Sequence, residues 1–324
     1  MKIAIIGGGW VGCHLANKLR DIHKVTIFEK NSKLFQETSY SNQNRLHRGY
    51  HYARNSKTRE LCEKTFTRFT NDYSFMVNAV HNNAYAIPKE SVLDYGTYKK
   101  IFYDYHFSEV DLGLDNLQDV ILVDERFINF KTAGEYFNNK LDDLVVNTEV
   151  TSAAALSEDF DLVINCTNNS IPDPDCKDAF YELAVTLLYD KVGYTPFGAL
   201  TLVDGEFFSI YPYEGNTYTV SDVKYTPVGQ FDKLKDLKIY PFHPVDITYY
   251  KEMFESRVMK YYPEFKEKFV YKDYFLATKA KYKNSSADRY PVISQQGNVI
   301  NCFTGKIQGI YVIEDYVKNE IARR

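Results

Sequence analysis

Cysteine and long hydrophobic runs are both scarce in this chain of 324 residues. No window reaches the roughly 18 consecutive apolar residues of a membrane span, so we expect no membrane segment. The first predicted strand begins at Lys2, which leaves no space for a signal peptide before it, so we expect a cytoplasmic protein. Five widely spaced cysteines without a C-x-x-C pair are typical of reduced thiols, so we expect neither a disulfide framework nor a metal site. These cysteines are Cys13, Cys62, Cys166, Cys176 and Cys302.

An excess of positive charge is also missing, with 39 Lys and Arg residues against 43 Asp and Glu and a formal net charge of -4. Without a polybasic segment, stable binding to nucleic acid through phosphate contacts is not expected. This balance does not exclude a local basic site for a small anionic molecule. The 44% hydrophobic and 25% charged residues are ordinary globular values. The length predicts about two domains, whereas composition says nothing of the oligomeric state.

The amino-terminal segment has the pattern of a dinucleotide-binding βαβ unit. A short apolar strand at Ile3–Ile6 is followed at once by the motif G-x-G-x-x-G at Gly7–Gly12. A helix with one apolar face is predicted over Cys13–Arg20, and a second strand over Val25–Phe28 ends at the acidic residue Glu29. Strand, glycine turn, helix, strand and acid in this order predict a site for a pyrophosphate and its ribose.

Each part of this unit has a physical role. Gly7 permits the tight turn, Gly9 lets the backbone approach a pyrophosphate, and Gly12 permits close packing of helix on strand. The free N–H groups and partial positive charge of the helix amino terminus attract phosphate. Glu29 can accept a hydrogen bond from a ribose hydroxyl and disfavours the 2′-phosphate of NADP, whereas the glycines alone do not separate NAD from FAD. The predicted cofactor-binding residues here are Gly7, Gly9, Trp10, Val11, Gly12, Glu29 and Lys30.

The densest group of polar and aromatic residues lies at 41–52, soon after the second strand. It contains two Arg, two His and two Tyr residues within twelve positions. A solvated loop leading into a helix at 57–69 is the plainer interpretation. Loops beyond the carboxyl ends of parallel strands, however, are where such folds bind their ligands.

The two amino-terminal motifs together resemble the D-amino-acid oxidase superfamily of FAD enzymes, which includes glycine and sarcosine oxidases. Residues 161–167 resemble the family's strand that returns to the adenosine half of the cofactor, and 288–310 resemble its carboxyl-terminal signature. In the family, a last helix, here 307–322, directs its amino terminus at the flavin pyrimidine, where a helix dipole stabilises the negative charge of reduced flavin. The resemblance adds these predicted cofactor-binding residues: Asn44, Arg45, Leu46, Val150, Cys166, Thr167, Gly305, Lys306 and Ile307.

The sequence departs from the family pattern at three places. Asn168 stands where the family usually has glycine after the threonine, and the closing turn has one glycine fewer than common relatives. Sarcosine oxidases bind flavin covalently through a cysteine shortly before the carboxyl-terminal signature, whereas residues 279–288 contain none. We therefore expect FAD to be bound non-covalently.

The predicted fold is α/β, with a Rossmann-type FAD-binding domain interleaved with an antiparallel-sheet substrate domain. From about Tyr181 the pattern changes to alternating β-branched and aromatic runs, separated by turns at Asp204–Gly205 and Glu214–Asn216. The family uses such a sheet as a floor over the flavin. The predicted FAD-binding domain comprises residues 1–80, 130–170 and 290–324, and the substrate domain comprises 81–129 and 171–289.

The predicted substrate contacts follow from the resemblance, because hydride transfer to flavin needs positioning and electrostatics more than acid–base groups. Arg48 and Lys306 fall where sarcosine oxidases bind the substrate carboxylate, and a forked guanidinium suits a carboxylate. Arg289 falls near an arginine with that role in the amino-acid oxidase branch. For Arg48 a structural ion pair is the alternative, and for Arg289 a salt bridge at the domain junction. His47 and His51 are candidate bases or donors to flavin, with a structural role as the alternative. The predicted catalytic residues, including one pocket wall, are Arg48, Lys306, Arg289, His51 and Tyr50.

These features predict an enzyme, an FAD-dependent oxidase or dehydrogenase. It would transfer hydride from the C–N bond of an amine or amino-acid-like substrate to flavin N5. Oxidation of a 2-hydroxy acid is an alternative, because residues 45–52 are also similar to flavin enzymes of that kind, and so is oxidation of a sugar or nucleotide amine. A non-redox use of FAD, as in a lyase, a mutase or a structural ligand, is an alternative of another class. A simple NAD-dependent dehydrogenase would be colourless when purified.

Overall fold

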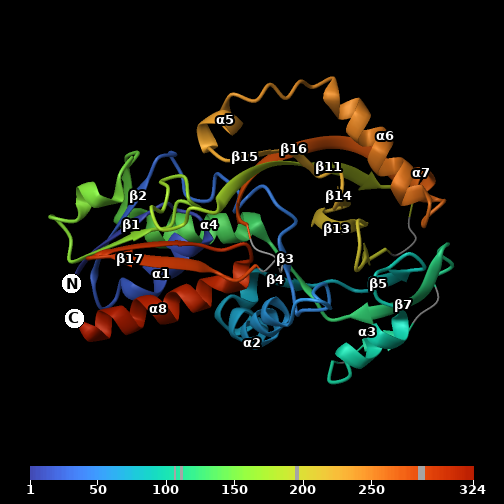
Figure 1. Ribbon diagram of the computed structural model, residues 1–324, viewed down its shortest axis with the longest axis horizontal. Helices are drawn as coiled ribbons and strands as arrows, with labels where there is room; N and C mark the ends of the chain where they lie inside the picture. The colour runs from blue at the N-terminus through green and yellow to red at the C-terminus, as the bar shows by residue number, and fades with distance from the viewer. Residues whose placement is uncertain (106, 110–111, 194–196, 284–288) are drawn as a thin grey trace.

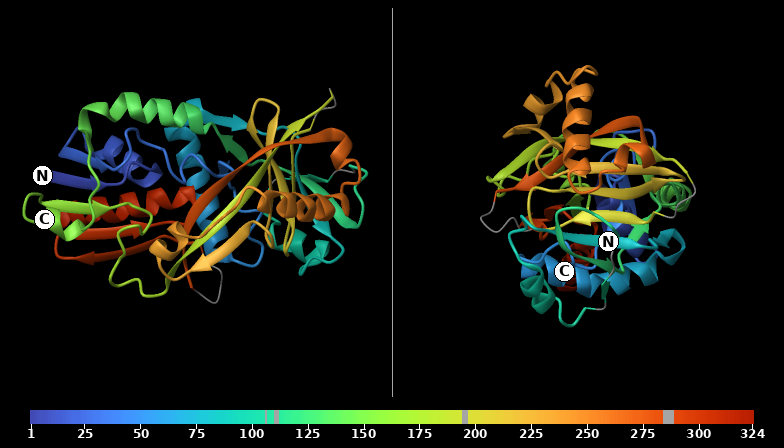
Figure 2. Two further views of the ribbon diagram at one scale, coloured as in Figure 1. Left: turned by 90° about the horizontal axis from the view of Figure 1, so that it is seen from above. Right: turned by 90° about the vertical axis from the view of Figure 1, so that its right-hand side faces the viewer.

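The computed structural model describes residues 1–105, 107–109, 112–193, 197–283 and 289–324. Figure 1 shows two large sheets side by side along the long axis, with both chain termini at the outer end of the first sheet. The termini meet at one residue, since the Lys2 N–H donates to the Asp161 carboxylate and the Arg324 guanidinium donates to the Asp161 carbonyl oxygen. The views in Figure 2 confirm that the sheets occupy opposite halves of the molecule.

The first sheet is mostly parallel and contains the amino-terminal strand. Within the described ranges its order is β17-β18-β10-β1-β2-β9, and β17 alone runs antiparallel to its neighbour. Ile5 of β1 lies opposite Ile164 on one side and Ile27 on the other. A central strand covered on both faces requires a continuous apolar run, as the sequence has at 3–6. The strands are β1 (Lys2–Ile6), β2 (Lys24–Glu29), β9 (Val145–Asn147), β10 (Leu162–Asn165), β17 (Val292–Gln296) and β18 (Val299–Phe303).

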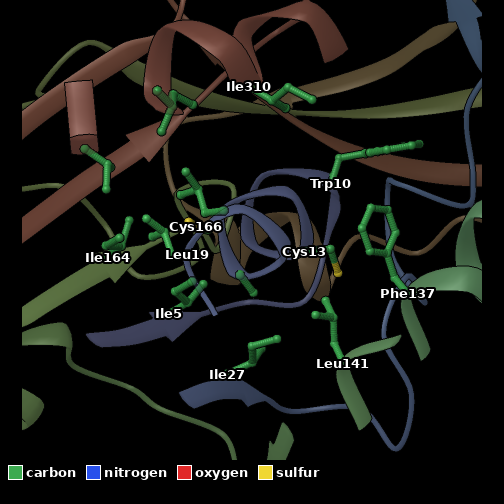
Figure 3. Packing of buried hydrophobic residues seen from close by; sticks show 14 of the residues in the cluster. Ile5, Trp10, Cys13, Leu19, Ile27, Phe137, Leu141, Ile164, Cys166 and Ile310 are labelled. Atoms are coloured by element: carbon green, nitrogen blue, oxygen red, sulfur yellow. The ribbon is translucent and has the colours of Figure 1, made fainter. Parts of the chain in front are cut away.

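Helices cover one face of this sheet and enclose the main core of the molecule. Figure 3 shows Ile5 and Ile164 of the sheet in the same cluster as Leu19, Phe137 and Ile310 from three different helices. Each of these five side chains is at most 3% exposed, so the helices are held to the sheet chiefly by apolar burial. The helices are α1 (Trp10–Leu19), α4 (Phe130–Leu141) and α8 (Ile310–Arg323).

The second sheet is mostly antiparallel and has nine strands in the described part of the chain. Its order is β15-β11-β14-β13-β12-β5-β7-β6, while β16 pairs along the whole length of β11. The parallel pairing of β12 with β5 brings distant parts of the sequence together. The strands are β5 (Asn83–Pro88), β6 (Phe107–Glu109), β7 (Leu117–Val123), β11 (Ala179–Lys191), β12 (Ala199–Leu202), β13 (Phe208–Glu214), β14 (Thr217–Asp222), β15 (Pro227–Phe231) and β16 (Phe269–Tyr282).

The two faces of the second sheet differ in polarity. One face packs Leu200, Ile210 and Val220 in a cluster with side chains of α6 (Asp246–Met259) and α7 (Phe265–Lys268), which Figure 1 shows above the sheet. Because side chains alternate along a strand, the neighbouring residues point to the opposite face. That face carries buried hydroxyl groups of Thr186, Thr201, Ser209 and Thr219.

A short third sheet of order β3-β8-β4 connects the two large ones. In its strand β3, Leu46 packs in the core of the first sheet, whereas the Arg45 guanidinium reaches Thr201 of the second. Its strands are β3 (Arg45–Leu46), β4 (Val77–Ala79) and β8 (Arg126–Ile128). The remaining helices are α2 (Ser56–Asp72), α3 (Tyr95–Ile101) and α5 (Leu234–Lys238), with 3-10 turns η1 (Ser74–Met76), η2 (Asp142–Leu144), η3 (Ala153–Leu156) and η4 (Ile307–Gly309). No helix in the described ranges is both long and apolar enough to cross a membrane.

The observed architecture is mixed α/β, as predicted, but three element boundaries were predicted wrongly. The first helix begins at Trp10 because Gly9 already forms its amino-terminal cap. The residues at 145–150 predict a strand from their sequence, but the strand that forms, β9, ends at Asn147, where the Thr148 N–H turns back to the Val146 carbonyl oxygen. The last helix begins as the 3-10 turn η4 and becomes α-helical only at α8. The assignment of residue ranges to a cofactor domain and a substrate domain stays a prediction.

Candidate functional site

The glycine turn after β1 is packed so closely that two of its residues must be glycine. Gly7 has a φ of +100°, and a Cβ atom there would lie 2.9 Å from the Cys166 carbonyl oxygen. A Cβ atom on Gly12 would lie 1.9 Å from the Gly7 carbonyl oxygen, so α1 can approach β1 only without a side chain at this position. Gly9 precedes α1 and has no side chain to cap its first turn. This backbone suits a pyrophosphate bound at the helix amino terminus.

The other residues predicted around this turn are placed differently. The Trp10 ring lies in the core, 5.0 Å from the Phe35 ring and 5.6 Å from the Phe137 ring, and Figure 3 shows Trp10 and Phe137 in the same cluster. Val11 is partly buried against the same core, so these two residues can offer a ligand only their backbone groups. Lys30 forms an ion pair with Glu37 at 2.7 Å on the surface.

Glu29 lies buried at the carboxyl end of β2, beside the glycine turn. Its Oε2 accepts a hydrogen bond from the Gly8 N–H at 2.7 Å, and its Oε1 accepts one from the Asn31 N–H at 2.8 Å. Each carboxylate oxygen has a further lone pair, so Glu29 can still accept hydrogen bonds from the hydroxyls of a ribose.

The residues predicted to bind the cofactor near the end of β10 mostly contact other parts of the protein. Cys166 is buried, with its Sγ 3.7 Å from the Cys302 Sγ on the neighbouring strand. Thr167 donates from Oγ1 to the Asn165 Oδ1 at 2.7 Å. Val150 is partly buried on the face of the first sheet opposite α1, in the cluster of Ala4. Of these residues, Cys166 approaches the glycine turn most closely, through its carbonyl oxygen at Gly7.

Arg45 is the central cation of the junction between the two large sheets. Its guanidinium lies 3.9 Å from the centre of the Tyr211 ring, and Nη1 donates to Thr201 Oγ1 at 2.8 Å and to the Tyr85 hydroxyl at 3.3 Å. Arg45 is 7% exposed, yet Nε and Nη2 have no hydrogen-bond partner among the described residues. Buried donors are normally paired, so this open edge of the guanidinium points to a ligand.

Glu125, in the turn between β7 and β8, balances this cation and was missed by the sequence analysis. It is 1% exposed and accepts hydrogen bonds from the Tyr85 hydroxyl at 2.6 Å and the Arg48 N–H at 2.8 Å. Burial alone would raise the pKa of Glu125, but His47, Arg45 and the Tyr85 hydroxyl lower it to about 2. Its position directly after the apolar residues of a strand could have indicated a functional carboxylate, but the sequence does not show which residues it contacts.

The two histidines of segment 41–52 are held neutral. Burial and the positive charge of Lys306 lower the pKa of His47 to about 4, although Glu125 opposes this change. Burial, His47 and Lys306 lower the pKa of His51 well below its usual range. The buried Nδ1 of His51 has no hydrogen-bond partner among the described residues. His51 is thus uncharged and open to a ligand at one ring nitrogen.

Lys306 and Arg289 form the second cationic group, before the amino terminus of α8. The Lys306 Nζ lies 4.9 Å from the centre of the Tyr52 ring. Gly305 packs on Arg289, since a Cβ atom added to Gly305 would lie 3.2 Å from the Arg289 Cδ. The pKa of Lys306 is lowered to about 7, chiefly by burial. Cys62 raises this pKa, whereas the positive charges of Arg289 and Arg45 lower it further. In the described part of the chain no acidic side chain forms an ion pair with Arg289.

Arg48 and Tyr50 do not join this group. Arg48 pairs with Asp124, with Nη1 3.3 Å from Oδ2, and its side chain is 35% exposed. Tyr50 is fully buried in an aromatic cluster with Tyr85 and Phe102, and burial raises the pKa of its hydroxyl. The predicted pairing of Arg48 with Lys306 therefore competes with an existing ion pair. The predicted role of Tyr50 as a pocket wall stays a prediction.

The remaining predicted residues frame the junction. Asn44 adopts a left-handed conformation with φ of +52° and caps its own turn through Asn42. Ile307 opens η4 and packs on the first core. Gln308, which the sequence analysis missed, is fully buried; its Nε2 donates to the His47 carbonyl oxygen, while its Oε1 has no partner among the described residues.

A third cationic group lies on β16, facing the junction from the second sheet. Lys281 pairs with the buried Glu182 of β11, and Lys279 lies opposite Glu182 in the strand register. Burial lowers the pKa of Lys279 to about 8, with Lys281 and Arg289 adding to this and Glu182 opposing it. Arg289 thus acts on both Lys279 and Lys306. Among the described residues, no three His, Cys, Asp or Glu side chains gather as a metal site.

Comparison with known proteins identifies the family. A family model described as "FAD dependent oxidoreductase", the DAO family, matches residues 2–78. The FAD-dependent monooxygenase FPY4 of Fusarium mangiferae is 33% identical over 334 residues, which cover 98% of this chain and 90% of that protein. The chain belongs to the DAO family of FAD-dependent oxidoreductases.

Solved structures show the same fold for this DAO-family protein. Glycine oxidase from Geobacillus kaustophilus matches 99% of this chain and 94% of its own, with a TM-score of 0.73 and 10% identity. L-α-glycerophosphate oxidase from Mycoplasma pneumoniae, solved with FAD bound, matches 97% and 92% with a TM-score of 0.70 and 13% identity. The predicted fold class and family are confirmed.

FAD is the cofactor of the family, and the residues of this DAO-family protein fit it. The glycine turn leaves space that a Cβ atom would fill, and Glu29 lies beside it with free lone pairs. At the other end, Arg45 and Gln308 leave buried polar atoms without partners in the described part of the structure. A dinucleotide offers a pyrophosphate and ribose for the first place and a polar ring system for the second. The fit therefore extends from the phosphate end to the ring end of the cofactor.

Proposed function

We propose that this DAO-family oxidoreductase binds FAD non-covalently and oxidises a small polar substrate, transferring hydride from a carbon that bears nitrogen to flavin N5. The observation that carries the proposal is the junction between the sheets. There Arg45, Lys306 and Arg289 gather beside two neutral histidines, with buried donors left open. Such a site can orient an anionic or hydrogen-bonding substrate on a flavin without an acid–base triad.

The phosphate end of the cofactor is assigned to the amino-terminal unit. The backbone of Gly7, Gly9 and Gly12 would receive the pyrophosphate, and Glu29 would accept hydrogen bonds from the adenosine ribose. The close contact of Gly12 with the Gly7 carbonyl oxygen supports this assignment, since it brings the helix amino terminus to the strand end. Trp10 and Val11 would contribute only their backbone.

The ring end is assigned to the segment 305–308 and to Arg45. Reduced flavin carries negative charge on its pyrimidine, and the amino terminus of α8 with Lys306 would stabilise that charge. The open Oε1 of Gln308 is available to an N–H of the ring system. The FAD supplies the electron acceptor, while this chain supplies orientation and charge.

For the substrate carboxylate, we propose Lys306 with Arg289 in place of Lys306 with Arg48. Arg48 already pairs with Asp124, whereas Arg289 perturbs Lys306 and has no ion-pair partner in the described ranges. Two neighbouring cations repel each other, and an anion that binds between them relieves this repulsion. An amino acid or other carboxylate-bearing amine supplies that anion.

A second candidate function is monooxygenation. It is favoured by the sequence relative, whose name describes an FAD-dependent monooxygenase. The two functions differ in the source of electrons. In an oxidase or dehydrogenase, the substrate itself reduces the flavin, whereas a monooxygenase of the common kind needs an external reductant such as NADPH before oxygen reacts.

Anaerobic titration separates these functions. The purified protein is expected to be yellow, and substrates would be added without oxygen while the flavin band at ~450 nm is followed. Amines, amino acids and 2-hydroxy acids are tested in parallel, with NADH and NADPH alone as controls. Bleaching by an amine or amino acid supports C–N oxidation, whereas bleaching by a hydroxy acid alone would show that the substrate is oxidised at a carbon bearing a hydroxyl. Reduction by NADPH alone favours the monooxygenase, while turnover without any bleaching favours a non-redox use of FAD.

A further inference from the structure

The hydrogen bonds around Glu125 determine where each proton lies. The Arg45 guanidinium can only donate, so at its contact with Tyr85 the phenol oxygen is the acceptor. The single hydrogen of the Tyr85 hydroxyl must then point to its other neighbour, the Glu125 Oε2 at 2.6 Å. On its other side, Glu125 Oε1 faces the backbone N–H of Arg48 at 2.8 Å, which is also only a donor. The pKa of Glu125 is lowered to about 2, so the group is a carboxylate at neutral pH and both of its oxygens can only accept.

This arrangement fixes the tautomer of His47. The His47 Nδ1 lies 3.2 Å from Glu125 Oε2, and two acceptors cannot form a hydrogen bond with each other. The proton of this contact must therefore belong to Nδ1. Burial and Lys306 keep the ring neutral, so Nε2 carries no proton and presents a lone pair.

The surroundings of His47 hold the ring in this position. The side-chain amide of Gln308 donates to the His47 carbonyl oxygen, which ties segment 41–52 to the start of α8. The ring packs against the Tyr52 ring at 5.4 Å between centroids. No described residue forms a hydrogen bond with Nε2. Nε2 is thus a fixed acceptor that has no hydrogen-bond partner among the described residues, and the charges of Lys306 and Arg45 act on the ring.

We propose that Glu125 is a positioning residue that fixes His47 as the Nδ1–H tautomer, so that Nε2 accepts a hydrogen bond from an O–H or N–H group of the substrate. The inference rests on the proposed function of the junction as the substrate site. A neutral amine needs only this hydrogen bond. For a hydroxyl substrate, Nε2 would take the O–H proton as the C=O bond forms, and FAD, when bound, would accept the hydrogen of the C–H bond with its electron pair.

Histidine nitrogen NMR of the full chain with FAD bound tests the tautomer directly. The protein is labelled with ¹⁵N-histidine, and the His47 signals are assigned by their loss in His47→Gln. We expect a protonated Nδ1 and an unprotonated Nε2 in the unsubstituted protein at pH 7. An Nε2–H tautomer, or a doubly protonated ring, in this spectrum would overturn the proposal. This reading requires no turnover, so it is independent of whether the predicted reaction occurs.

Substitution of Glu125 supplies the second measurement. Glu125→Gln keeps the shape but can donate to Nδ1, so the Nε2–H tautomer is expected to increase. Tyr85→Phe is the matched control, because it removes one donor to Glu125 and leaves the carboxylate; it should keep the Nδ1–H tautomer. With a substrate that bleaches the flavin, the bleaching rate should fall at least tenfold in Glu125→Gln and recover in part in Glu125→Asp. An unchanged tautomer in Glu125→Gln would contradict the positioning role.

Discussion

At the scale of single residues, the site depends on which cations have an internal partner. Arg48 has Asp124, and Arg45 lies near the ionised Glu125, so the charge of each is largely compensated. Burial lowers the pKa of Lys306, and the positive charge of Arg289 lowers it further. The chemical character of a lysine or arginine in this protein therefore follows from neighbours that lie far away in sequence.

Lys306 should make anion binding dependent on pH. Its pKa is lowered to about 7 from an ordinary value of 10.5, so the ammonium is present below about pH 7 and is lost as the pH rises. Binding of benzoate, a simple carboxylate, should weaken through this range, and Lys306→Met should lose about tenfold in affinity at pH 6, as expected for one charge-assisted hydrogen bond. Flavin absorbance changes report the binding. Lys24→Met, on the exposed start of β2, is the control and should behave as the unsubstituted protein. If the pH step persists in Lys306→Met, another group carries it.

At the scale of elements, two glycines within helices have opposite roles. Gly12 in α1 lies where the helix meets β1, and an added Cβ atom would clash with the Gly7 carbonyl oxygen at 1.9 Å. Gly134 in α4 has space for a side chain, because a Cβ atom added there would lie 3.7 Å from the Phe35 Cβ, an ordinary van der Waals contact. The first glycine is required by packing, whereas the second only weakens its helix.

The two glycines give a matched pair of alanine substitutions. Gly12→Ala should displace α1 from β1, lower the free energy of unfolding by more than ~2 kcal/mol and weaken FAD binding strongly, as an overpacked contact does. Gly134→Ala should raise the free energy of unfolding by about 0.5–1 kcal/mol, because alanine favours the helix, and leave FAD binding unchanged. Urea denaturation and FAD titration measure both effects. Equal behaviour of the two variants would show that the close contact at Gly12 is not needed.

At the scale of the whole molecule, the proposed FAD site joins segments from both ends of the chain. The first strand and its glycine turn lie in the same sheet as β18, which leads directly into η4 and α8. The second sheet faces this unit with a polar surface, and β3 carries Arg45 across to it. A bound cofactor would therefore contact segments that lie far apart in the sequence, and its binding should stabilise the whole molecule.

Denaturation tests the predicted non-covalent binding. Acid precipitation should release all of the yellow colour into the supernatant, since residues 279–288, where sarcosine oxidases have their flavin-binding cysteine, contain no cysteine. Colour that stays with the pellet would mean a covalent bond. Added to the apoprotein at about 100 times its Kd, FAD should stabilise the fold by ~2.7 kcal/mol and raise the Tm. FMN, which lacks the adenosine half, should raise the Tm less if Glu29 and the glycine turn bind that half.

Much of the fold could be read from local patterns. The run at 3–6, the glycines at 7–12 and Glu29 define the βαβ unit, because each of their roles depends on neighbours within about thirty residues. Alternating runs after Tyr181 similarly predicted the antiparallel sheet. The boundaries were less accurate: β9 ends earlier than predicted because a turn at Thr148 interrupts it.

The sequence by itself determined the dinucleotide unit, the fold class and the family of this protein, since short-range periodicity and glycine spacing are properties of neighbouring residues. Only the tertiary structure decided the partners of the charged groups. Arg48 was directed to Asp124 and not to Lys306, and Glu125 and Gln308 were brought to His47 from distant segments. The physical reason is that the pKa and the hydrogen-bonding state of a buried group depend on everything within a few ångströms, and in this fold those neighbours come from both ends of the chain.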